Sequence, residues 1–167
     1  MTFGIPFASV PRPALAVIVL AVGLSGALVV YVRMTSPHQT VIEFNIITND
    51  GATGYSRPAS LVINDSDTWA KVWTQAYCPN PCEAVPPVNF NTRTVIAVFW
   101  GTQPGPLYNI KITQIVQSGS NITVHVLWTE AGNCGESTQE TWPSYIVDIP
   151  KTESHITFVT ETFMMHC

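Results

Sequence analysis

The sequence predicts an α+β fold that is mainly β: an antiparallel sheet with one amphipathic helix, preceded by one N-terminal transmembrane helix. Three observations support this fold class. The run from 95 to 100 is apolar, of strand length, and rich in β-branched and aromatic residues. Two later segments, 108–113 and 122–129, alternate apolar and polar residues as a half-buried strand does. A further segment, 69–76, places its apolar residues at helical spacing.

The transmembrane helix is predicted over residues 14–32, which include no charged residue and lie between Arg12 and Arg33. At 1.5 Å per residue, a helix of this length crosses a hydrocarbon core of about 30 Å. Residues 1–13 form a short N-terminal tail and residues 33–40 a stalk. The alternative is a cleaved signal peptide, because the small residues at 25–27 suit a signal peptidase.

Charge and cysteine usage predict that the N-terminus lies in the cytoplasm and the C-terminal domain outside. The amino terminus and Arg12 precede the apolar run, and all four cysteines follow it. From Met34 onward there are 11 acidic residues and 5 basic ones, once Arg12 and Arg33 are set aside from the chain's 7, for a net charge of −6. This balance argues against nucleic acid or anionic lipid as a partner, since both require clustered cations.

The predicted extracytoplasmic domain, 41–167, begins with a strand at 41–48 and a short strand at 59–63. An amphipathic helix follows, with Asp65 positioned to cap its N-terminus. Its apolar face carries Trp69 and Trp73, which we assign to the core and not to a ligand-stacking surface.

The central strand at 95–100 is predicted to be buried on both faces, because its apolar run is unbroken. The alternating segments 108–113 and 122–129 form an antiparallel hairpin with one dry face. Segments 144–149 and 155–163 are expected to form a last pair of strands, joined at Pro150-Lys151.

The four cysteines predict two disulfides in an oxidising compartment. Of three connectivities, we favour Cys78 with Cys82, which bracket a Pro-Asn-Pro bend, and Cys134 with Cys167, which ties down the C-terminus. The alternative is a structural zinc ion held by the four thiolates, or by three of them with His166.

No catalytic motif accompanies the histidines, and we expect neither an enzyme nor a cofactor or bound metal. His125 and His155 are interpreted as exposed strand residues. A spatial pair such as Glu130 with His125 is left open, which keeps a hydrolase as the least favoured function.

Several consecutive motifs resemble one known family. They are the tryptophan-bearing helix, then Pro87-Val88-Asn89-Phe90, the strand that ends in Trp100-Gly101, the turn into Tyr108, and the segment from Pro143 to Lys151. Over about residues 65–163 the chain resembles the PrcB C-terminal domain family, named after an accessory subunit of a surface subtilisin-like protease complex. The resemblance implies a non-catalytic, extracytoplasmic domain that assists other proteins. Where the family shows a Gly-Gly-Tyr turn, this chain has Gly105-Pro106-Leu107-Tyr108, so the family's loop geometry is not carried over.

These features favour a membrane-anchored accessory domain that contacts or stabilises another extracytoplasmic protein, such as a protease. A structural subunit of a surface assembly is the alternative, and a homo-oligomer is left open. The predicted contact region is the turn Gln103-Pro104-Gly105-Pro106 with neighbouring Tyr108. A proline-rich turn held by a buried strand presents its groups with little ordering entropy to lose on binding.

Overall fold

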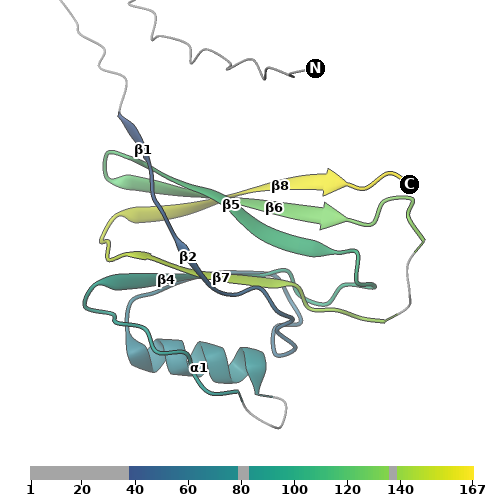
Figure 1. Cartoon of the computed structure of the whole chain (residues 1–167), viewed down its shortest axis with the longest axis horizontal. Coiled ribbons are helices and arrows are strands. Elements are labelled where there is room, and N and C mark those ends of the chain that lie inside the picture. The colour runs from purple at the N-terminus through teal and green to yellow at the C-terminus, as the bar shows by residue number, and fades with distance from the viewer. Residues whose placement is uncertain (1–37, 79–82, 136–138) are drawn as a thin grey trace, which may run out of the picture. The chain divides into compact units, whose positions relative to one another are not determined.

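A computed structural model describes residues 38–78, 83–135 and 139–167, and His38–Cys167 form one compact unit (Figure 1). The predicted tail, the transmembrane segment 14–32 and most of the stalk lie outside these residues. Within the described ranges, no helix is both long enough and apolar enough to span a bilayer.

Two four-stranded sheets and one short helix build the unit. Sheet A has the strand order β1 (Gln39–Val41), β5 (Asn109–Ser118), β6 (Asn121–Glu130) and β8 (His155–Met164). Sheet B has the order β2 (Asn45–Thr48), β7 (Ser144–Pro150), β4 (Arg93–Phe99) and β3 (Ala59–Ile63). Sheet A covers one face of sheet B, and helix α1 (Ser66–Tyr77) covers the other (Figure 1). Sheet B is therefore the middle layer of three.

Strand β4 is buried on both faces, which confirms the prediction from its apolar run. Ile96 and Val98 pack against sheet A, whereas Val95, Ala97 and Phe99 pack against the helix. Its neighbour β7 divides its side chains in the same way. The core therefore consists of two apolar clusters, one on each side of β4 and β7.

The predicted amphipathic helix is confirmed. Asp65 is its N-cap, and its Oδ1 accepts a hydrogen bond of 2.8 Å from the backbone N–H of Thr68, which lowers the pKa of the Asp65 carboxyl. Trp69 and Trp73 are buried among the side chains of sheet B, as predicted for core residues. Their indole N–H groups donate to backbone carbonyls of the following segment: Trp69 to Pro86 at 2.9 Å and Trp73 to Glu83 at 3.2 Å.

The hairpin of β5 and β6 is also confirmed, with Ser118 paired to Asn121 across the turn. Its dry face packs on sheet B through Ile110, Ile112, Ile115, Ile122, Val124 and Val126. The register shifts between Ile112 and Gln114, where β5 has a bulge.

Two expectations about the strands are wrong, one on the continuity of the first strand and one on the pairing of the last two. The predicted first strand, 41–48, is divided: β1 pairs with β5 in sheet A, and β2 pairs with β7 in sheet B. The chain thus changes sheets within one short segment, which a strand pattern cannot reveal.

The last two strands do not pair with each other, and the fold is not a single antiparallel sheet. β7 lies inside sheet B between β2 and β4, whereas β8 lies in sheet A and runs parallel to β6. The physical reason is burial. β7 is buried on both faces and fits between two layers, whereas β8 is exposed along most of its length and fits at an edge.

Candidate functional site

The turn predicted as a contact region begins where β4 ends. Trp100 and Gly101 are buried, and Gly101 has a φ of 85°, a conformation that glycine adopts without strain. A Cβ atom at Gly101 would lie 2.9 Å from the carbonyl oxygen of Ser56. The N–H of Thr102 donates to that same carbonyl at 3.2 Å. Glycine is thus required here by both the backbone conformation and the close approach of the 56–57 segment.

Hydrogen bonds from Thr141 brace the turn. Gln103 and Thr141 exchange backbone hydrogen bonds of 2.7 and 2.9 Å, and the Thr141 hydroxyl donates to the carbonyl of Gly105 at 2.8 Å. The next residue, Trp142, donates its indole N–H to the Thr102 hydroxyl at 3.0 Å. The turn is therefore held in one conformation by a segment far away in the sequence.

The turn presents only some of the residues singled out from the sequence. Pro104 and Pro106 are exposed, whereas Gly105 between them is buried. Gln103 is half-buried, and its amide donates to the carbonyl of Trp100 at 3.3 Å. Tyr108 is half-buried against the core. The accessible surface of the turn is therefore formed mainly by its two proline rings.

Tyr108 belongs to an aromatic cluster beneath the turn. Its ring meets the Trp100 ring edge-on with centroids 5.6 Å apart, and Trp100 lies 4.8 Å from Trp128. Within the described residues, the buried indole N–H of Trp128 has no hydrogen-bond partner. The cluster gives the turn a rigid apolar base, so Tyr108 acts here as a support.

Sequence reasoning did not identify Thr102, Thr141 or Trp142 as part of this region. Thr102 is exposed beside Pro104, and the other two lie in a polar loop far along the chain. No local signal marks a threonine that braces a distant turn, because the contact arises only when the two segments meet in space.

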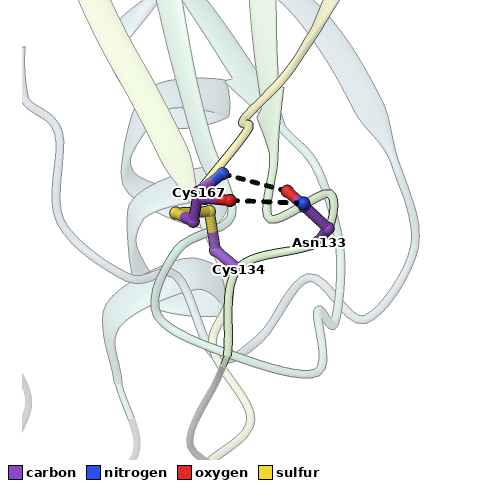
Figure 2. Close-up of a disulfide and its surroundings, with 3 residues drawn as sticks. All are labelled: Asn133, Cys134 and Cys167. Atoms are coloured by element: carbon purple, nitrogen blue, oxygen red, sulfur yellow. Dashed lines mark hydrogen bonds between the residues drawn. A yellow bond between two sulfur atoms is a disulfide. The ribbon is translucent and has the colours of Figure 1, made fainter.

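The C-terminus is held by the disulfide between Cys134 and Cys167, which confirms the second predicted pair (Figure 2). The amide side chain of Asn133 holds the same end of the chain: its Oδ1 accepts from the Cys167 N–H at 3.0 Å, and its Nδ2 donates to the Cys167 carbonyl at 3.4 Å. The other predicted pair stays a prediction, because Cys82 lies outside the described residues.

The disulfide also bears on the zinc alternative. A sulfur bonded to another sulfur is not a thiolate, so Cys134 and Cys167 are not zinc ligands in this state. The described part of the chain includes no cluster of three or more side chains suited to hold a metal ion.

The catalytic pair that the sequence left open is not formed. His125 and Glu130 lie five residues apart on β6, which places them about 16 Å apart along the strand and on opposite faces. Two side chains so placed cannot share a proton.

A buried serine on β7 has a structural environment. The Ser144 hydroxyl donates to the carbonyl of Asp50, so the hydrogen bond of 2.7 Å between Ser144 and Tyr77 takes its proton from the tyrosine. Burial raises the pKa of Tyr77 to about 12. The arrangement fastens the end of α1 to β7 and to the loop after β2.

Comparison with known proteins yields no relative: no family model, no curated protein and no solved structure matches the chain.

Proposed function

We propose that the protein is a membrane-anchored, extracytoplasmic accessory domain that binds another cell-surface protein through the turn after β4. The anchor is the apolar segment 14–32, with the N-terminus in the cytoplasm. The resemblance to the PrcB C-terminal domain family supports a protease as the partner.

The observation that carries this proposal is the braced turn. Pro104 and Pro106 are exposed on a loop that Thr141 and Trp142 hold by backbone and side-chain hydrogen bonds. A loop already fixed in one conformation loses little entropy on binding, and proline side chains add no rotamer freedom. The Cys134–Cys167 disulfide supports an extracytoplasmic location, because disulfides persist in oxidising compartments.

The proposal is tested by co-purification of the full chain from its own membrane. The variant Pro104→Ala/Pro106→Ala removes the exposed rings and leaves the backbone bridge to Thr141 in place. We expect the melting temperature to change little and the amount of co-purified partner to fall. The matched control is Pro150→Ala, an exposed proline at the end of β7, which should leave both quantities unchanged.

A second variant separates presentation from contact. Thr141→Val removes the hydroxyl that donates to Gly105 but alters no exposed group of the turn. Weaker co-purification would show that the fixed conformation contributes to binding. If the double proline variant retains its partner in full, the binding surface lies elsewhere.

The alternative function is a structural subunit of a surface assembly. One observation favours it: β8 is a long strand at the edge of sheet A, with its outer edge unpaired in the described structure. Such an edge can accept a strand from a neighbouring molecule.

A further inference from the structure

Among the edge strands that the structure describes, β8 is the longest. It extends over ten residues, whereas the other three edge strands, β1, β2 and β3, extend over three, four and five. In the described ranges β6 is the single strand that pairs with it, along its full length and without a register shift. One side of β8 is therefore a straight row of backbone groups with no strand beside it among the residues that the structure describes.

The parallel pairing determines which of these groups are free. The N–H of His155 donates to Ser120 at 3.0 Å, and the N–H of Met165 donates to Glu130 at 2.9 Å. Alternate residues of a strand direct their N–H and C=O groups to the same neighbour. The odd-numbered residues of β8 therefore bond β6, and the even-numbered ones direct their backbone groups to the open edge: Ile156, Phe158, Thr160, Thr162 and Met164.

This edge lacks the features that protect natural edge strands. It has no proline, no lysine and no bulge, and Glu161 is its one acidic residue. Val159, Phe163 and Met164 are 43, 55 and 50% exposed, large values for apolar side chains. A long edge strand that exposes several large apolar side chains is typical of an edge that a further strand covers.

Sheet B leaves space for a neighbour along β8. The even-numbered side chains point toward sheet B, and the first two, Ile156 and Phe158, pack into the core between the sheets. Thr160, Thr162 and Met164 point the same way but are exposed. Sheet B therefore does not extend over the second half of β8.

We propose that β8 pairs antiparallel with the β8 of a second copy, around a two-fold axis at Thr160, so that the two four-stranded sheets become one sheet of eight strands. A two-fold axis brings the same edge of each copy together. The inference goes beyond the proposed function, since it concerns an edge strand and not the turn after β4.

The register of the proposed β8–β8 pair follows from the unpaired backbone groups of β8 and from the charge of Glu161. With the axis at Thr160, all five outward residues are paired, Ile156 lies opposite Met164, and about ten backbone hydrogen bonds form. With the axis at Phe158, Thr162 and Met164 would remain without partners. With the axis at Glu161, two carboxylates would lie directly opposite each other, which is destabilising.

The second copy's β8 fits this edge better than its β1 does. β1 extends over only three residues and would leave most of β8 uncovered. In addition, β8-to-β1 pairing would be head-to-tail and would not close after two copies. β8 is complementary to itself in length and in hydrogen bonding, and this register also places the apolar Ile156 and Met164 opposite each other.

The first test measures the mass of the full chain in detergent by light scattering over a concentration series. We expect a dimer for the natural sequence. Thr160→Pro removes an N–H that does not bond β6 and places a ring at the open edge, and Thr160→Lys adds a charge there. Each should weaken dimerisation at least tenfold. The matched control Thr40→Lys, at the opposite edge of sheet A, should leave the dimer unchanged.

The second test fixes the register with a short thiol cross-linker of less than about 10 Å. Thr160→Cys places the two new thiols next to the two-fold axis, so this variant should cross-link as a dimer. Thr157 is also an exposed threonine of β8, but in this register it lies opposite Phe163 of the other copy. The two cysteines of Thr157→Cys would therefore be separated by six residues along the strand, about 20 Å, and should not cross-link.

Four results would overturn the proposal, and the first three concern β8 itself. They are a monomer at about 100 µM, a dimer that persists in both Thr160 variants, and equal cross-linking at positions 157 and 160. Loss of the dimer in Thr40→Lys would instead indicate β8-to-β1 pairing and would overturn it as well. Partner binding through the turn is measured separately with the proline variants, so the two proposals fail independently.

Discussion

The two sheets of this domain differ in how they are covered. Sheet B lies between sheet A and helix α1, and its central strands β4 and β7 are buried on both faces. Sheet A is covered by sheet B on one face, whereas its other face carries polar and half-buried residues. Sheet A also ends in the long exposed strand β8. The difference indicates that sheet B supplies most of the stability and that sheet A supplies the surface available for association.

The largest effect is expected from Trp69→Ala, at the interface of α1 with sheet B. The Trp69 side chain is 2% exposed, and its loss would destabilise the fold by about 3–5 kcal/mol through lost burial and an unfilled cavity. Chemical denaturation followed by circular dichroism measures this change in free energy of unfolding.

The matched variant is Phe163→Ala in β8, where the ring is 55% exposed. At dilutions where the protein is monomeric, it should change stability by less than about 0.5 kcal/mol. If Trp69→Ala and Phe163→Ala lower the free energy of unfolding equally, the conclusion that sheet B supplies most of the stability is wrong.

The second largest effect is expected from removal of the disulfide by Cys134→Ser/Cys167→Ser. Closure of a loop with a sequence separation of 33 stabilises a fold by about 3–4 kcal/mol through the entropy of the unfolded chain. The bridge fastens the end of β8 to the segment after β6, so local loss of order should begin there. If removal of the disulfide accelerates amide hydrogen exchange more in β8 than in β4, the contrast between the two sheets is sharpened. Equal acceleration in both sheets would contradict it.

A smaller effect is expected from Tyr77→Phe, which removes the hydrogen bond to Ser144 across α1 and β7. At neutral pH the loss should be about 1 kcal/mol, because one partner of a buried hydrogen bond is removed. The midpoint of urea denaturation reports it.

The same variant should also change the response to alkali. The pKa of Tyr77 is raised to about 12 in the folded state, above its ordinary value of 10.0. The contribution of Tyr77 to the free energy of unfolding is present in full below pH 10. It is lost as the pH rises toward 12, because Tyr77 ionises at lower pH in the unfolded chain than in the folded protein. Tyr55 and Tyr145 also have raised pKa values from burial, so part of the decline should remain in Tyr77→Phe. An identical decline in both proteins would contradict this role.

The smallest effect is expected from Asp65→Ala at the start of α1. The carboxylate accepts from the N–H of Thr68, and its pKa is lowered by that bond. The ionised Asp65 carboxylate stabilises the fold fully above its ordinary pKa of 3.8. This stabilisation is lost as the pH falls through the lower pKa that Asp65 has in the folded protein. The melting temperature at neutral pH should fall less than in Tyr77→Phe. Asp65→Asn, which retains an acceptor oxygen, should recover most of the difference.

Local patterns in the sequence determined the elements themselves. An unbroken apolar run predicted that β4 is buried on both faces, alternation predicted the β5–β6 hairpin, and helical spacing with Asp65 as cap predicted α1. These features depend on residues close together in the chain, so short-range periodicity identifies them. The pairing of Cys134 with Cys167 was also predicted, because Cys78 and Cys82 bracket a Pro-Asn-Pro bend and were assigned to each other.

Tertiary structure alone decided how the elements are combined. The sequence placed 144–149 beside 155–163, but β7 lies in the centre of one sheet and β8 at the edge of the other, parallel to β6. Strand neighbours are selected by the burial that all layers achieve together, and a strand pattern carries no information about its partner. For the same reason Thr141 gave no sign that it braces the turn at 103–105. The exposed edge of β8 likewise exists only because β6 is paired on one side and no described strand follows on the other.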